Sequence, residues 1–263
     1  MYEEELSFAH ALADAAAEIA LSLFGTDLEV RTKPDRTPVT EADVGIERMI
    51  RERLAERFPD DAVLGEEAGH TGDARRTWVV DPIDGTKNFA AGIQIWATLI
   101  ALLVDERPVL GLAGAPGLGE RYAASEGGGA TLNGRSIHVS ETASVEDALL
   151  LGAGESSLLG GPDQAWFVEL TTRARRTRGF GDFWAHLLVA RGAADVALEP
   201  ELHVWDYAAL VPIVEEAGGR VSTLEGTSLR DGGSMLTTNG RLHDEVLSVI
   251  RDGGRAAGAG PRA

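Results

Sequence analysis

In the stretch WVVDPIDGTKNF, residues 78–89, an apolar run is followed by two aspartates, Asp81 and Asp84. The apolar start is typical of the end of a buried strand. A carboxylate in such a place loses its hydration and needs a partner. Pro82 fixes its own φ and favours an extended Asp81, while Gly85 allows a ligand to approach the backbone closely. The stretch therefore predicts a hard cation beside the two carboxylates and a phosphate group at the start of the helix that follows.

The composition and net charge of the chain limit the classes of molecule that it is expected to bind. The chain has 263 residues, 44% hydrophobic and 25% charged, which is ordinary for a soluble globular protein. Its net charge of −18 argues against a nucleic-acid or membrane partner, and an anionic small substrate would be repelled unless bound cations reverse the field. The chain has no cysteine, which excludes disulfides and thiolate chemistry. Acidic residues interrupt the apolar N-terminal run, so we expect no secretory segment and a cytoplasmic protein.

Spacing and capping signals predict the main elements. Apolar residues at helical spacing predict a first helix that ends at Gly25. Thr40, with Asp43 three residues on, is a good N-cap for a second helix. Residues 93–116 predict two strands around a turn, and beyond residue 148 apolar strands alternate with helical stretches. This alternation favours an α/β second half.

Further acids stand at the ends of apolar runs. Glu66 ends one strand, Asp206 follows HVW, and Asp43 lies one turn into the second helix. Carboxylates and waters hold Mg²⁺, which substrate phosphate often completes, and two such ions can activate a water and stabilise a leaving oxygen. Each acid also has a simpler interpretation: a solvated Glu-Glu pair, an N-cap at Asp206, and an Asp-Pro turn for the opening pair.

Four segments resemble, in order, the motifs of the inositol monophosphatase-like family of metal-dependent phosphatases. They are DRTPVTEAD at 35–43, GEE at 65–67, DPIDGTKNF at 81–89 and HVWDYAALVPIVEEAGG at 203–219. DPIDGT together with WDxAA is a highly specific signal, whereas GEE alone is weak. The resemblance implies an α/β (α+β) fold, the layered α-β-α-β-α sandwich of this family, and Mg²⁺-dependent hydrolysis of phosphate monoesters.

The resemblance also implies a ligand set for two or three Mg²⁺ ions. One ion would lie on Glu66, Asp81 and the Ile83 carbonyl. A second would lie on Asp81, Asp84 and Asp206. A third, weaker ion near Glu66 occurs in some members of the family.

Catalytic and phosphate-binding roles follow from the same resemblance. Asp43, Glu66 and Thr86 are the implied catalytic residues, with Thr86 hydrogen-bonded to Asp43 to orient the attacking water. The amides of Gly85 and Thr86 would receive the phosphate at a helix N-terminus.

We expect two halves and a tail. Residues 1–140 would form an N-terminal α+β half that carries most of the metal ligands. Residues 141–252 would form a C-terminal α/β half that carries Asp206 and a substrate-specificity segment. The Gly/Ala-rich residues 253–263 are expected to be disordered.

The segment GFGDFW at 179–184 resembles the bacterial histidinol-phosphate phosphatases of this family, which serve histidine biosynthesis. Histidinol phosphate carries an ammonium and an imidazole, whereas inositol offers only hydroxyls. Asp182, Glu199 and Glu201 could supply negative charge, and Trp184 or Phe183 could stack on the ring or the cation. The alternative is that both aromatic residues belong to the core.

Other functions remain open. The same fold could act on inositol 1-phosphate, fructose bisphosphate or an adenosine bisphosphate. It could also serve as a non-catalytic partner protein, although the intact acid set argues against a lost active site. Dimers are common in the family, so we expect a homodimer.

Overall fold

The computed structural model describes residues 1–26, 30–32, 38–152, 159, 164–230 and 232–258. The chain divides into two compact units, Met1–Ser136 with Val204–Glu216, and Ile137–His203 with Ala217–Ala263. Along the chain, the first unit gives way to the second between Ser136 and Ile137, whereas the sequence predicted the boundary after residue 140. Val204–Glu216, which carries Asp206, belongs to the first unit, whereas the sequence analysis assigned it to the second half. Residues 35–37 of the first motif lie outside the described residues.

The first unit contains an eight-stranded sheet with the order β10-β9-β8-β7-β6-β5-β3-β4. Its strands are β3 (Ala62–Gly65), β4 (Gly69–Thr71), β5 (Arg76–Asp84), β6 (Ala97–Val104), β7 (Arg107–Ala115), β8 (Glu120–Ser125), β9 (Gly129–Leu132) and β10 (Arg135–Ser136). β3 and β5 are parallel, and the other neighbours are antiparallel. The predicted turn between β6 and β7 is present, with Asp105 at φ 51° and Glu106 at φ 63°. A separate ladder pairs β1 (Val30–Thr32) with β2 (Pro38–Thr40).

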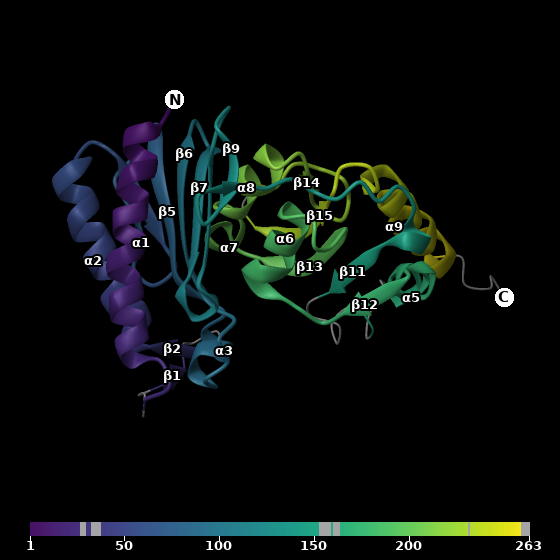
Figure 1. Ribbon diagram of the computed structural model, residues 1–263, viewed down its shortest axis with the longest axis horizontal. Helices are drawn as coiled ribbons and strands as arrows, with labels where there is room; N and C mark the ends of the chain where they lie inside the picture. The colour runs from purple at the N-terminus through teal and green to yellow at the C-terminus, as the bar shows by residue number, and fades with distance from the viewer. Residues whose placement is uncertain (27–29, 33–37, 153–158, 160–163, 231, 259–263) are drawn as a thin grey trace. The chain divides into compact units, whose positions relative to one another are not determined.

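Helices cover both faces of this sheet (Figure 1). α1 (Glu3–Leu23) and α2 (Glu41–Arg57) pack on one face, and α8 (Leu210–Glu216) packs on the other. Successive side chains of β7 point to opposite faces of the sheet. Leu110 and Leu112 point to the face under α1 and α2 and belong to the hydrophobic core there. Gly111 faces α8, where a Cβ would come within 2.0 Å of the Ala209 carbonyl oxygen. The glycine thus lets α8 approach the sheet and keeps Val204–Glu216 in the first unit.

Helix α1 is long and apolar enough to cross a membrane by length and composition alone. Ala9, Leu12, Ala16 and Ala20 on one side of it are nevertheless buried in the core of the first unit. Gly25, at φ 74°, follows its last turn. α1 therefore serves as the amphipathic core helix that the sequence predicts.

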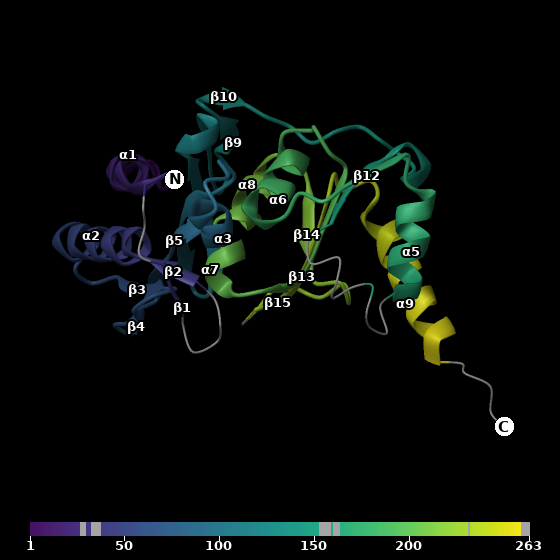
Figure 2. The same cartoon turned by 90° about the horizontal axis from the view of Figure 1, so that it is seen from below.

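The second unit contains a five-stranded sheet with the order β12-β11-β13-β15-β14. Its strands are β11 (Leu149–Gly152), β12 (Arg176–Arg178), β13 (Val196–Leu202), β14 (Arg220–Ser222) and β15 (Gly233–Thr238). α5 (Gln164–Arg173) and α9 (His243–Gly258) cover one face and α6 (Asp182–Ala190) covers the other (Figure 2). Leu150 packs on the α5 and α9 side, whereas Leu151 packs on the α6 side. The predicted alternation of helices and strands therefore forms three layers in this unit, with the sheet between α6 on one face and α5 with α9 on the other.

The last helix extends into the predicted C-terminal tail. α9 continues to Gly258, past residue 253 where the tail was predicted to begin, and residues 259–263 lie outside the described ones. At Gly253 a Cβ would come within 2.6 Å of the Trp166 Cβ, so the absence of a side chain lets α9 approach α5 closely. Extending a formed helix also needs no new nucleus. Composition alone could not reveal this packing.

Candidate metal centre

A β-bulge at the end of β5 gives the opening motif its geometry. Asp81 pairs with Leu99 of β6 and Asp84 pairs with Ala97, so three steps on β5 match two on β6. Without the extra residue, side chains three positions apart would point to opposite faces of the sheet. The Thr98 hydroxyl donates to the Pro82 carbonyl at 2.8 Å in the buried bulge. The bulge therefore turns both carboxylates to one face.

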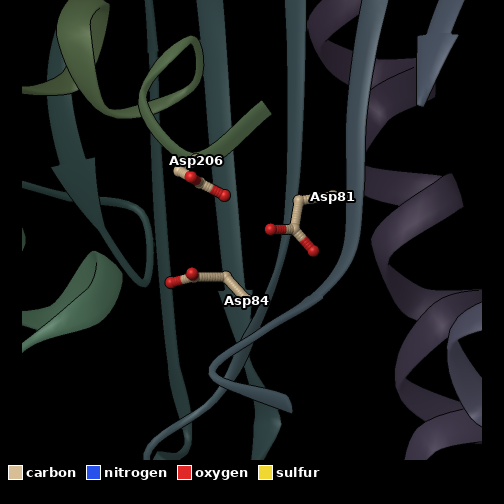
Figure 3. Close-up of side chains that lie close together, drawn as sticks. All are labelled: Asp81, Asp84 and Asp206. Atoms are coloured by element: carbon tan, nitrogen blue, oxygen red, sulfur yellow. The ribbon is translucent and has the colours of Figure 1, made fainter. Parts of the chain in front are cut away.

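Three carboxylates converge on this face (Figure 3). Asp81, Asp84 and Asp206 each offer an oxygen, and these oxygens all lie within 4.8 Å of one another. Asp81 and Asp84 are buried and Asp206 is half-buried. Asp206 comes from the short helix α7 (Val204–Tyr207), which precedes α8 on the same face. Residues far apart in sequence thus form one acidic cluster within the first unit.

The environment of Asp81 suits a cation. Burial raises its pKa well above the usual value, and the negative charges of Glu66, Asp84 and Asp206 raise it further. Its Oδ1 atom is buried and has no hydrogen-bond partner among the residues that the structure describes. A buried carboxylate oxygen that no donor satisfies is costly unless a positive charge compensates it. A cluster of three carboxylates, one of them with such an oxygen, suits a hard divalent cation such as Mg²⁺.

Glu66 and Ile83 lie at the edges of the cluster. Glu66 begins the turn after β3, and its amide donates to the Val80 carbonyl at 3.3 Å, next to Asp81 in sequence. Its carboxylate is close enough to raise the pKa of Asp81 and of Asp43. The Ile83 carbonyl accepts a hydrogen bond from the Thr86 hydroxyl at 2.9 Å. A carbonyl oxygen has a second lone pair that could serve a cation.

Asp43 forms the buried polar network that the capping signal predicts. Its Oδ2 atom accepts from the Thr40 amide at 2.8 Å and from the Thr40 hydroxyl at 2.5 Å, at the start of α2. Its Oδ1 atom lies 3.4 Å from the Thr86 hydroxyl, which is closer to Ile83. Burial raises the pKa of Asp43, the Thr40 hydrogen bonds lower it, and the nearby Glu66 raises it again. The hydrogen bond between Thr86 and Asp43 is therefore present, but long.

Gly85 joins the bulge to the short helix α3 (Thr86–Ala90). It has φ 83° and ψ 36°, the left-handed region that favours glycine, and it precedes the first helical residue. The requirement for glycine in this motif is thus conformational.

Of the residues predicted to bind substrate, Gly85 and Thr86 lie in the first unit, and Asp182, Trp184 and Glu199 lie in the second. Asp182, at φ 54°, starts α6, and Glu199 lies in β13 before a register shift. Trp184 is partly buried and contacts Phe180, with ring centroids 4.9 Å apart. Phe183 is only 1% exposed, so its alternative interpretation as a core residue holds. The roles of Asp182, Trp184 and Glu199 stay predictions.

Glu47 is a buried acid beside the cluster's turn that was not predicted from the sequence. It is 1% exposed and accepts hydrogen bonds from the amides of Glu67 and Ala68, in the turn that begins with Glu66. A signal was available, because Glu47 falls on the buried helical stripe that runs from Asp43 to Leu54 in α2. An acid on a core-facing stripe calls for a partner.

Comparison with known proteins agrees with this geometry. The model of the inositol monophosphatase family matches residues 1–255. The chain belongs to the inositol monophosphatase family. It is 45% identical to a histidinol-phosphatase of Streptomyces coelicolor over 95% of this chain and 97% of that protein. It is also 45% identical to a histidinol-phosphatase of Mycobacterium tuberculosis over 96% of this chain and 100% of that protein.

A solved structure of this family supports the fold. An inositol monophosphatase from Zymomonas mobilis is 35% identical and superposes with a TM-score of 0.86, covering 95% of this chain and 99% of that one. The predicted family and α/β fold class are therefore confirmed. Members of the inositol monophosphatase family are metal-dependent, and the cluster of Asp81, Asp84 and Asp206 could bind the metal.

Proposed function

We propose that this protein is a Mg²⁺-dependent phosphatase that hydrolyses L-histidinol phosphate to L-histidinol and phosphate, a step of histidine biosynthesis. The observation that carries the metal-dependent reaction is the convergence of three carboxylates, one of which, Asp81, has a buried oxygen that no hydrogen bond from the described residues satisfies. The substrate is supported by the two relatives named histidinol-phosphatase, each 45% identical over nearly the whole chain. Membership of the family makes a small phosphorylated substrate the expected class.

In this proposal two sets of oxygen ligands hold the metal. Glu66, Asp81 and the Ile83 carbonyl would bind one Mg²⁺, and Asp81, Asp84 and Asp206 would bind a second. Glu66 could also hold a third ion. Bound Mg²⁺ supplies a Lewis acid that offsets the negative charge of the phosphate and of this acidic chain.

Thr86 and Asp43 would position the attacking water. The Thr86 hydroxyl has one proton, and when it donates that proton in a hydrogen bond to Asp43, its oxygen can accept a hydrogen bond from a water. Asp43 is held by two hydrogen bonds from Thr40, so the acceptor is fixed in place. The backbone amides of Gly85 and Thr86 would receive the phosphate oxygens.

Three residues are proposed, from the resemblance and their chemistry, to recognise the organic part of the substrate. Asp182 and Glu199 would pair with the ammonium and imidazole, and Trp184 would present a flat apolar surface to the ring. Asp182 has a left-handed backbone, with φ 54°, at the start of α6.

The test is to compare kcat/KM for L-histidinol phosphate and inositol 1-phosphate side by side, with Mg²⁺ and with excess chelator. We expect histidinol phosphate to be preferred and activity to require Mg²⁺. A preference for inositol 1-phosphate, or for fructose or adenosine bisphosphates, would leave the reaction in place and refute the substrate. No phosphate release from any of them would favour a non-catalytic partner role.

We also propose that the enzyme is a cytoplasmic homodimer. Dimers are common in the family, as the resemblance implies. Light scattering over a range of protein concentrations would give the oligomeric state, and fractionation of cells would give the compartment.

A further inference from the structure

The turn at residues 66–68 joins β3 to β4 and begins with Glu66. Its three backbone amides all have acceptors. The Glu66 amide donates to Val80 at 3.3 Å, the Glu67 amide to Glu47 Oε2 at 2.7 Å, and the Ala68 amide to Glu47 Oε1 at 3.0 Å. Two of the three acceptors are thus the two oxygens of one side chain from α2.

Glu47 is a buried charge with a complete set of partners. Arg51, one turn later on α2, donates to Glu47 Oε1 at 2.7 Å. Arg51 also donates to the Gly69 carbonyl and, at 3.0 Å, to the Thr71 hydroxyl of β4. The ion pair offsets the charge of Glu47, so this carboxylate adds little to the negative field of the acidic cluster.

The glycine that precedes the turn makes room for this contact. A Cβ at Gly65 would come within 2.3 Å of Glu47 Oε1 and 2.7 Å of Glu47 Oε2. Each residue of the Gly-Glu-Glu motif therefore has its own role. Gly65 leaves space for the Glu47 carboxylate, Glu66 brings a carboxylate to the acidic cluster, and the Glu67 amide donates a hydrogen bond to Glu47.

We propose that Glu47 is a positioning residue for the metal centre, which fixes the turn so that the Glu66 carboxylate stays beside Asp81. The inference rests on the proposed function. Like charges repel, and without a cation Glu66 would move away from Asp81 and Asp43 if its backbone were free. Glu47 prevents this movement through charge-assisted hydrogen bonds to the two residues that follow Glu66. The ligand is thus in position before the metal binds.

The first test is the affinity for Mg²⁺, measured by titration calorimetry without substrate. Glu47→Gln keeps the shape of the side chain but turns an NH₂ group toward one of the two amides. We expect its Mg²⁺ affinity to fall about 10–100-fold, as for other groups that orient metal ligands. Glu52→Gln is the matched control, because Glu52 is an exposed residue of the same helix, and it should bind Mg²⁺ as the wild type does.

Circular dichroism would verify that the Glu47→Gln protein is folded. A folded variant with wild-type Mg²⁺ affinity would overturn the inference, even if its melting temperature were lower. A wild-type protein that binds no Mg²⁺ would overturn the proposed function as well, so the two failures are distinguishable.

Hydrogen exchange on the metal-free wild type does not depend on the folding of a variant. The amides of Glu67 and Ala68 should exchange slowly without Mg²⁺, because Glu47 already holds them. Exchange of these amides at the rate of an unstructured chain, with protection only after Mg²⁺ is added, would show that the metal orders the turn and would refute the role of Glu47.

Discussion

Asp81 shows how one residue can oppose folding and still be required. Its pKa is raised by burial and then by Glu66, Asp84 and Asp206, so the ionised form costs folding free energy. A carboxyl group with a raised pKa contributes stability at low pH and loses it as the pH rises through its folded-state pKa. At neutral pH without metal, Asp81 therefore destabilises the fold, and bound Mg²⁺ would reverse this effect.

We expect Asp81→Asn to raise the melting temperature of the metal-free protein and to abolish the further rise that Mg²⁺ causes in the wild type. Activity should fall by more than about 100-fold, since even groups that only orient metal ligands contribute 10–100-fold. Thermal unfolding with chelator and with Mg²⁺ checks the first part. A lower metal-free melting temperature in the variant would mean that Asp81 is satisfied within the protein.

Thr86 tests whether the network at the start of α2 takes part in the reaction. We expect Thr86→Ala to lower kcat on the order of 10²–10⁴-fold with little change in KM, because the hydroxyl would orient the water and not the substrate. Steady-state kinetics with saturating Mg²⁺ gives both constants. A change in KM alone would indicate a structural role for the hydrogen bond to Ile83.

At the scale of elements, the close contact between Gly111 of β7 and Ala209, the residue before α8, holds α7 and its Asp206 against the sheet. Gly111→Ala would put a Cβ within 2.0 Å of the Ala209 carbonyl, and backbone on both sides leaves no easy relief. We expect a loss of stability on the order of 1–3 kcal/mol, as for other overpacked sites, together with weaker Mg²⁺ binding as α7 and Asp206 shift. Denaturant unfolding and calorimetry measure the two effects.

Gly114→Ala is the control on the same strand. Its Cβ would meet the Ala13 Cβ at 3.5 Å, an ordinary contact on the opposite face. This variant should retain Mg²⁺ binding and most of its stability. Equal damage from both substitutions would mean that β7 tolerates no side chain at either position, and that α8 has no special role.

At the scale of the whole molecule, buried histidines make stability depend on pH. His243 is fully buried, and its ring nitrogens each lie 3.0 Å from a hydroxyl, of Ser222 and of Thr238. Burial, and then the charge of Arg220, lowers its pKa from 6.5 to about 4. A histidine with a lowered pKa contributes stability above its unfolded value and loses it as the pH falls towards the folded value.

The free energy of unfolding should therefore fall between pH 6.5 and about 4, with His243 contributing on the order of 3 kcal/mol at most. The gap in stability between the wild type and His243→Gln should shrink as the pH is lowered through this range. Denaturant unfolding in chelator-containing buffer at several pH values measures the gap. A constant gap would show that folding does not lower the pKa of His243.

Local signals were sufficient for much of the fold and for the acids of the site. The helix that Thr40 caps, the turn between β6 and β7 and the apolar strand before Asp81 follow from rotamer, turn and burial preferences that neighbouring residues impose. The stretch around Asp81 and Asp84 predicted a cation by itself, and the resemblance to the inositol monophosphatase family added the expected metal roles of Glu66 and Asp206. These features depend on short stretches of chain, because capping, turn and strand preferences act between residues that are close in sequence.

Only the tertiary structure decided the rest. Periodicity cannot show that a bulge turns Asp81 and Asp84 to one face, because the extra residue is defined by its pairing with β6. It cannot show that Val204–Glu216 joins the first unit or that Glu47 holds the turn after β3. Each of these depends on contacts between segments far apart in sequence, whose free energy arises only when the chain has folded around them.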